Sequence, residues 1–166
     1  RYTRYEVIGW YGGNGRPVVS VSAQRAPDAE WYGAAPRLLR DLRGAQAQAV
    51  IDKLDRAVAD YAFPTEYRAW PGPNSNTFVA HLGRAIPELR LAMPSTAIGK
   101  DYVSLTDSVG PSASHTGFAV SLYGLVGVTA AVEEGLELNV LGLVTGVDLK
   151  RPALKLPGIG RVPGDG

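Results

Sequence analysis

Apolar residues in the first half of the chain recur at the spacing of two helix faces. Within 36–61 they lie three and four residues apart, at Ala47, Val50, Ile51, Leu54, Val58 and Tyr61. Gly44 divides this region into a short and a longer predicted helix. The same spacing returns after a cluster of turn-forming residues, at Phe78, Val79, Leu82, Ala85 and Ile86. It stops at Pro87. Because Asn, Ser and Thr are favourable N-caps, we predict that this second helix begins within 74–77.

The start of the chain has the pattern of a β-hairpin. Residues 5–11 are aromatic and β-branched, and 12–17 is a cluster of turn-forming residues. In 18–22, Val19 and Val21 alternate with serines. This pattern predicts a hairpin whose second strand is half buried.

The character of the chain changes after Thr116. Segments 118–132 and 136–147 are almost continuously apolar, with interspersed glycines, and three residues, Glu133-Glu134-Gly135, separate them. The uncharged stretch 108–132 raises the question of a membrane span, but its apolar part is shorter than the ~20 residues that a spanning helix needs. We predict two buried strands instead.

These elements predict an α+β fold in a single domain, 1–166. We expect one antiparallel sheet, formed by the hairpin and the 118–147 strands, with two main helices packed on it. We expect 106–114 to be an exposed loop. We expect 152–166 to be an extended tail, because it is too rich in Pro and Gly for a regular element.

Composition narrows the classes of function. The 166 residues are 45% hydrophobic and 20% charged, which suits one domain with a sizeable core. A formal net charge of +1 lacks the basic footprint of a nucleic-acid-binding protein, so we expect no nucleic-acid partner. The absence of Cys excludes disulfides, zinc–thiolate sites, iron–sulfur clusters and a cysteine nucleophile. Two histidines are too few for a His-built metal centre, and we expect no metal or cofactor.

Segment 70–81 holds the candidate chemistry. A serine in the first turn of a helix has unpaired N–H groups beside it and the positive end of the helix dipole behind it, which lowers the cost of charge on a nucleophile or an oxyanion. Ser75 is therefore the candidate catalytic residue, with Asn74 and Asn76 beside it. The alternative is that Asn74 or Ser75 is simply an N-cap.

Partners for Ser75 are scarce in the chain. His81 follows six residues later, so on one helix it lies ~9 Å along the axis and on another face; we expect it on the helix flank. His115 is expected to be a solvated loop residue unless long-range folding brings it to Ser75. Asp101 could orient a base as a third triad member, or could form an ion pair with Lys100.

Two further groups of residues admit more than one interpretation. The acidic cluster could contribute to a cation site, although a turn with solvated charges is the simpler interpretation; it consists of Glu133, Glu134 and Glu137. The tryptophans could be anchors at a surface or membrane interface, although most are expected at the core or its edge; they are Trp10, Trp31 and Trp70.

Five segments of the chain are distinctive: Tyr67-Arg68-Ala69-Trp70-Pro71-Gly72-Pro73-Asn74-Ser75-Asn76-Thr77-Phe78, Ala97-Ile98-Gly99-Lys100-Asp101-Tyr102, Glu134-Gly135-Leu136-Glu137-Leu138, Leu141-Gly142 and the stretch from Pro152 to Arg161. In these segments the chain resembles a bacterial membrane-anchored domain family of unknown function. More distantly, such proteins are similar to permuted papain-like proteins, among them NlpC-type cell-wall peptidases and lecithin-retinol-acyltransferase-like enzymes. Those proteins carry a His on an early strand and an Asn-Cys-x-x-Phe motif that opens a helix. Here 74–78 matches the motif, with Ser75 in the Cys position.

The resemblance implies a permuted papain-like fold and an extracytoplasmic, periplasmic location. It also implies that a membrane anchor, a first strand and a His-x-Trp segment precede this chain. The base expected for Ser75 would then lie outside 1–166.

Three functions are compatible with these observations. The favoured one is a non-catalytic accessory or interaction domain of a bacterial membrane-associated protein or complex, with other membrane or periplasmic proteins as partners. The second is a serine-dependent acyl hydrolase or transferase, an amidase or esterase, with Ser75 as nucleophile and an upstream His as base. The third is binding of a lipid, peptide or small ligand in a pocket lined by the apolar 118–147 sheet.

Overall fold

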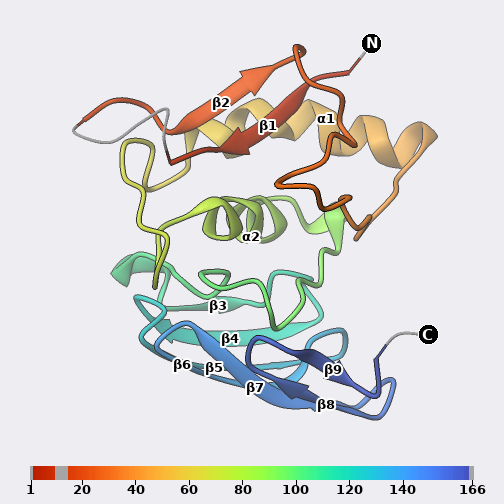
Figure 1. Cartoon of the computed structure of the whole chain (residues 1–166), viewed down its shortest axis with the longest axis vertical. Coiled ribbons are helices and arrows are strands. Elements are labelled where there is room, and N and C mark those ends of the chain that lie inside the picture. The colour runs from red at the N-terminus through yellow and green to blue at the C-terminus, as the bar shows by residue number, and fades with distance from the viewer. Residues whose placement is uncertain (1, 10–14, 165–166) are drawn as a thin grey trace.

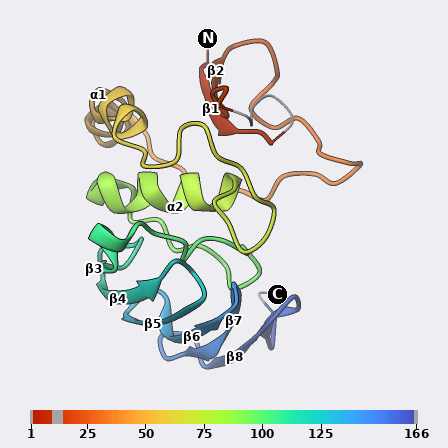
Figure 2. The same ribbon diagram turned by 90° about the vertical axis from the view of Figure 1, so that its left-hand side faces the viewer.

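Helix α2 (Ser75–Ala85) lies in the middle of the molecule, with a different layer on each side (Figure 1). One layer contains a two-stranded hairpin, β1 (Arg4–Val7) and β2 (Val19–Ser22), and helix α1 (Gly44–Ala59). The other layer is a seven-stranded sheet, and Figure 2 shows the same order of layers from the side. The predicted α+β class is confirmed, with one helix between two separate sheets.

The predicted β-hairpin is present, since β1 and β2 pair antiparallel. The computed structural model describes residues 2–9 and 15–164, so half of the predicted turn, 12–14, lies outside the described residues, as does Trp10. Val18, just before β2, is fully buried, whereas Val21 is 54% exposed. The burial therefore lies at the start of the second strand and does not follow its alternation.

The main hydrophobic core fills the space between the hairpin, α1 and α2. Phe78 and Ile86 of the α2 region are completely buried in it, and the ring of Tyr61 meets that of Phe78 edge to face at 5.2 Å. Burying side chains of this size stabilises the fold by about 1.5–3 kcal/mol each. The buried members of this core are Val7, Val18, Val50, Ala57, Tyr61, Phe78, Leu82 and Ile86.

Both predicted main helices are present, and the first is shorter than expected. Helix α2 begins at Ser75 and ends before Pro87, as predicted. Helix α1 begins at Gly44, so the short helix predicted from Pro36 is wrong. Gly44 has a φ of +58°, a left-handed conformation through which a right-handed helix cannot continue. Leu38 before it is 76% exposed and has no core to support a helix.

The larger sheet is an antiparallel meander in which neighbours in sequence are neighbours in space. Short 3₁₀ turns, η1 (Pro87–Leu89) and η2 (Leu105–Asp107), lie between α2 and this sheet along the chain. The prediction that the hairpin belongs to this sheet is wrong, because β1 and β2 form a sheet of their own. The strands of the meander are β3 (Val109–Pro111), β4 (Gly117–Leu122), β5 (Val126–Ala131), β6 (Gly135–Val140), β7 (Leu143–Asp148), β8 (Ala153–Leu156) and β9 (Gly160–Val162).

The two apolar runs form four strands, and the Pro- and Gly-rich tail forms two more. Each run reverses at a tight turn, one at 123–125 and one at 141–142. Tyr123 and Leu141 have φ values of 50° and 53° in these turns, and each is followed by a glycine. The prediction of an extended tail without regular structure is wrong, because β8 and β9 complete the sheet in this segment.

The seven-stranded sheet turns a polar face towards α2 and an apolar face away from it. We call these the inner and the outer face. The apolar side chains of 118–147 were expected to be buried, but most of the large ones are exposed on the outer face, whereas Val144 is buried. The pairing register aligns the outer face in cross-strand rows that contain one Thr and no charged residue: Val109, Val120, Val128, Leu138 and Thr145; Pro111, Phe118, Ala130, Leu136, Val147, Leu154 and Val162; and Leu122, Val126, Val140 and Leu143.

Candidate functional site

The turn that opens α2 is held by its own side chains. Asn74 is the N-cap, and its Oδ1 accepts hydrogen bonds from the backbone N–H groups of Asn76 (2.9 Å) and Thr77 (3.2 Å). In return, the backbone N–H of Asn74 donates to Thr77 Oγ1 at 3.0 Å. This reciprocal pair is a capping box, and it uses the N–H groups that otherwise remain free in the first turn.

The same asparagines tie the helix to two other segments. Asn74 Nδ2 donates to the carbonyl oxygens of Ala69 and Ile98, each at 3.0 Å. Asn76 Nδ2 donates to the same Ile98 oxygen at 2.9 Å. The structure therefore places both candidate asparagines in a junction between the helix and its flanking loops.

Gly99 makes room for this junction. Its φ is +91°, and a Cβ at this position would lie 2.5 Å from Asn74 Nδ2. Its carbonyl oxygen also accepts a hydrogen bond from Thr77 Oγ1 at 2.8 Å. A side chain at residue 99 would therefore displace the cap of α2.

Ser75, the candidate nucleophile, is the first residue of α2 and is exposed. Its Oγ makes no hydrogen bond with any residue in the described part of the chain. It borders an open groove of about 750 Å³, in which Glu6 is the one carboxylate among the described lining residues, and that carboxylate is paired with Arg4 at 2.6 Å. The described lining contains no imidazole; it consists of Glu6, Val7, Ile8, Gly9, Trp31, Tyr32, Tyr67, Ala69 and Ser75.

Both histidines bind backbone carbonyl groups away from Ser75. His81 lies on the flank of α2, as predicted, and its Nε2 is 2.7 Å from the backbone oxygen of Ala57 in α1. Burial lowers the pKa of His81 below its ordinary value, although the hydrogen bond to Ala57 opposes this shift. His115 Nε2 is 2.7 Å from the Arg84 oxygen, and the residue is half-buried, so the expectation of a solvated histidine is wrong.

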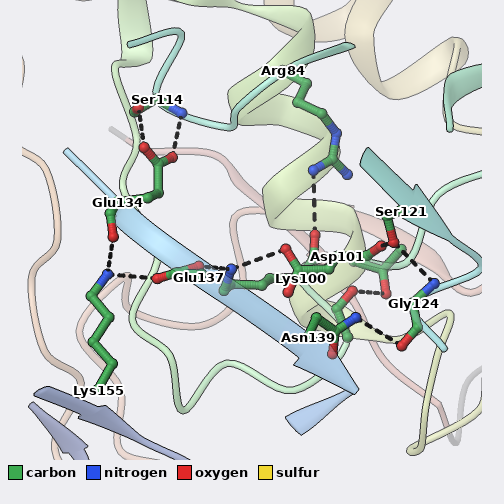
Figure 3. A network of polar contacts seen from close by, with 12 residues as sticks. Arg84, Lys100, Asp101, Ser114, Ser121, Gly124, Glu134, Glu137, Asn139 and Lys155 are labelled. Carbon is green, nitrogen blue, oxygen red and sulfur yellow. Dashed lines mark hydrogen bonds and ion pairs between the residues drawn. The ribbon is translucent and has the colours of Figure 1, made fainter. Parts of the chain in front are cut away.

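Asp101 pairs with a lysine and takes part in a buried charge network (Figure 3). Lys100 Nζ lies 3.0 Å from Asp101 Oδ1, which confirms the predicted ion pair, and 2.6 Å from Glu137 Oε2. The other carboxylate oxygen of Glu137 is 2.5 Å from Lys155 Nζ. Burial alone would lower the pKa of Lys100, but the charges of Asp101 and Glu137 outweigh burial and raise it. Lys100 is therefore a buried, charged lysine between two carboxylates.

The network continues to a loop that was expected to be exposed. Lys155 Nζ donates to the carbonyl oxygen of Glu134 at 2.5 Å. The Glu134 carboxylate accepts hydrogen bonds from the backbone N–H (2.9 Å) and the Oγ (2.5 Å) of Ser114. The interpretation of solvated charges is therefore wrong for Glu134 and Glu137, and Ser114 is buried although its segment was predicted as an exposed loop. The interpretation of solvated charges is right for Glu133, which makes a partly exposed ion pair with Lys150.

Backbone carbonyl groups accept hydrogen bonds from three further polar side chains in this network. Ser121 Oγ donates to the Asp101 oxygen at 2.5 Å, and Asn139 Nδ2 donates to the Gly124 oxygen at 2.9 Å (Figure 3). Arg84 Nη1 of α2 donates to the Lys100 oxygen at 3.3 Å.

In residues 2–9 and 15–164 the structure has no cluster of three or more His, Asp or Glu side chains that could hold a metal ion.

A cavity of about 340 Å³ lies beside α2 and the β3–β4 edge of the sheet. From 118–147 it is lined by Ala119 and Ser121, so this cavity is not the predicted pocket lined by the apolar side chains of the sheet. The buried hydroxyl of Tyr61 has no partner among the described residues, and burial raises its pKa above the ordinary range. Arg84 and Asp101 also line this cavity, beside apolar residues such as Phe63 and Val103, so its lining is mixed.

Trp70 lies at the surface, as one of the interpretations of the tryptophans proposed. Its indole Nε1 donates to the Leu141 carbonyl oxygen at 2.7 Å, although the side chain is half exposed. This bond connects the segment before α2 to the turn between β6 and β7.

The outer face gathers many of the exposed apolar side chains of the described residues on one side of the sheet. Its large side chains that are roughly half exposed or more are Val109, Phe118, Val120, Leu122, Val126, Val128, Leu136, Leu138, Val140, Leu143, Leu154 and Val162. Monomeric soluble proteins seldom expose apolar patches above about 300–600 Å².

Among the described helices, neither α1 nor α2 combines the length and apolar character needed to cross a bilayer.

The fold and site define an α+β protein in which a capped central helix separates a small hairpin layer from an amphipathic antiparallel sheet. The family model of DUF3750, a protein of unknown function, matches residues 1–102, which is more than half of the chain. The chain therefore belongs to the DUF3750 family. The matched region contains the hairpin, both helices and the Asn74 junction, and it ends before β3. No curated protein and no solved structure matches the chain.

Proposed function

We propose that this DUF3750 chain is a non-catalytic interaction domain of a membrane-associated bacterial protein or complex. The outer face is the observation that carries the proposal, because an uncharged apolar face of this size is costly in water and marks a binding surface. The bacterial, membrane-associated and extracytoplasmic parts of the proposal rest on the family resemblance of the sequence. The permuted papain-like relationship rests on the same resemblance.

The surroundings of Ser75 support a non-catalytic role. A serine nucleophile needs a base within hydrogen-bond reach, and both imidazoles in the chain bind backbone carbonyl groups elsewhere. The N–H groups of Asn76 and Thr77, which could stabilise an oxyanion, already donate to Asn74 Oδ1. Asp101, the candidate third member of a triad, holds Lys100.

Site-specific cross-linking in cells tests the interaction role. A photoreactive benzoylphenylalanine at Val128 on the outer face should form covalent adducts with a protein on illumination. The matched control is Val21, a strand valine of equal exposure on the hairpin layer (54% against 53%), which should form none. The absence of adducts from Val128, with the variant present at the wild-type level, would count against the proposal.

A serine-dependent acyl hydrolase is the second candidate. The exposure of Ser75 at the start of α2, beside an open groove, is the observation that favours it. A fluorophosphonate probe should then label the protein, and Ser75→Ala should abolish the labelling. Labelling at Ser75 together with Ser75-dependent ester or amide hydrolysis would replace the non-catalytic proposal.

A further inference from the structure

We propose that the occupant of the outer face is the outer face of a second copy of the chain. The inference rests on the proposed function as an interaction domain and names its partner. Two seven-stranded sheets would pack face to face about 10 Å apart, as in a β-sandwich, and would be related by a twofold axis. The inner face of each sheet would keep its contacts with α2.

The area of the outer face suits a stable dimer. Its dozen large apolar side chains, each about half exposed, together offer roughly 1,000 Å² of accessible surface. A specific interface of standard size buries about 800 Å² on each partner, and obligate homodimers bury more. One outer face therefore has the area that one partner must contribute.

The charge pattern of the outer face favours an identical partner. A twofold axis brings each residue near its own copy, so a charged residue close to the axis would meet a like charge. The rows of the outer face contain no charged residue. The nearby Lys150 is already neutralised by Glu133 at 2.5 Å. Two copies can therefore approach without electrostatic repulsion at the face.

A lipid surface is a poorer match for the same face. Peripheral membrane surfaces combine an apolar face with an excess of Lys and Arg and with interfacial aromatic residues. Residues 109–162 contain equal numbers of acidic and basic residues, and Phe118 and Tyr123 are their two Phe, Tyr or Trp residues. The outer face is otherwise aliphatic, which is typical of the interior of a sandwich.

The edges of the sheet direct association to its face. The edge strands β3 and β9 have three residues each. Pro111 lies within β3, and Pro163 follows β9 directly. Short edge strands with proline resist the addition of another strand. The middle of the face is then the expected position of the twofold axis, near Val128 of β5 and its register partner Leu138 of β6.

Sedimentation equilibrium of the chain and three variants tests the proposal. The wild-type chain should sediment with the mass of two chains. Val128→Glu should raise the dimer Kd by at least about a hundredfold, because it places two carboxylates in the centre of the interface. Val21→Glu, at equal exposure on the hairpin, should leave the Kd unchanged. Leu138→Glu, on the neighbouring strand, is a second disrupting variant, and far-UV circular dichroism verifies that each variant is folded.

The outcomes separate this inference from the proposed function. A wild-type chain that is monomeric at about 100 µM, well above the Kd of a stable interface, would overturn the second copy as occupant. So would a dimer that persists in folded Val128→Glu and Leu138→Glu. Flotation of a monomeric chain with anionic phospholipid vesicles, lost in Val128→Glu, would assign the face to a membrane. Cross-links from Val128 to a different protein would also overturn the dimer while leaving the role as an interaction domain in place.

Discussion

Replacing Glu137 with glutamine should destabilise the fold strongly, although the two side chains have nearly the same size. Glu137 lies between the ammonium groups of Lys100 (2.6 Å) and Lys155 (2.5 Å), and all three side chains are at most 6% exposed. The substitution Glu137→Gln would leave Lys155 beside a neutral amide and Lys100 with Asp101 as its remaining carboxylate. Removing one member of a buried ion pair costs about 3–5 kcal/mol, which is a large part of a typical unfolding free energy of about 5–15 kcal/mol.

Glu133→Gln is the matched control. Glu133 also contacts a lysine, Lys150, at 2.5 Å, but these side chains are 36% and 52% exposed. Water solvates both charges when the pair is broken, so the expected loss is about 0–1 kcal/mol. The two substitutions therefore make the same chemical change and differ in burial.

Urea unfolding followed by far-UV circular dichroism measures both free energies. A second measurement uses pH, because Glu137 is one of the two carboxylates that raise the pKa of Lys100. Its loss lowers the pKa of Lys100 relative to the wild-type chain, so the folded variant binds fewer protons, and its stability deficit against the wild type should narrow as the pH rises through about 10–11. Glu133→Gln should show no such narrowing.

Equal losses in the two variants, or a loss below about 1 kcal/mol in Glu137→Gln, would refute this reasoning about the network. Either result would mean that water already solvates the charges between the sheet and α2. A stability deficit of Glu137→Gln that does not change with pH would refute the assignment of the loss to the weakened pairing of Lys100.

Three further predictions concern α2 and its surroundings. Asn74→Ala should lower the unfolding free energy by about 2–3 kcal/mol, because it removes the cap and two loop contacts, whereas Ser75→Ala should change it by less than about 0.5 kcal/mol in the same urea titration. Gly99→Ala should lower the melting temperature far more than Gly158→Ala: both glycines have a positive φ, but a Cβ at residue 158 meets nothing within 4 Å. Because burial lowers the pKa of His81, the unfolded state binds its proton more tightly, and stability should fall from pH 7 to pH 5; His81→Gln should reduce that slope, and an unchanged slope would exclude His81 as its source.

Local signals were sufficient to predict the start and end of α2. The cap residue Asn74 and the stop at Pro87 act within a few residues of the positions that they determine, so the sequence pattern contains them. The turns inside the apolar runs have a weaker signal, because Gly124 and Gly142 also suit close packing between strands. The apolar pattern alone therefore predicts two long strands, where the structure has four.

The direction in which the sheet faces could not be predicted from alternation. In β6, Leu136 and Leu138 alternate with Glu137 and Asn139, and this pattern is the same for either orientation. The usual rule places the apolar set inside, and that rule is wrong for this sheet. The deciding partner of Glu137 is Lys100, which is 37 positions away in sequence, and no local pattern links the two.

An amphipathic sheet can lie on a helix with either side down, and Lys100 makes its two sides non-interchangeable. A sheet turned over, or slipped by one residue in register, would place apolar rows against α2 and release Glu137 and Lys155 into water. Such a fold would gain apolar contacts, but it would remove Glu137 from the buried ammonium of Lys100 and leave Asp101 as the remaining carboxylate of that pair. One lysine in the loop before the sheet thus destabilises the fold in which the sheet is turned over. Every folded molecule therefore presents the same side of its sheet to a partner.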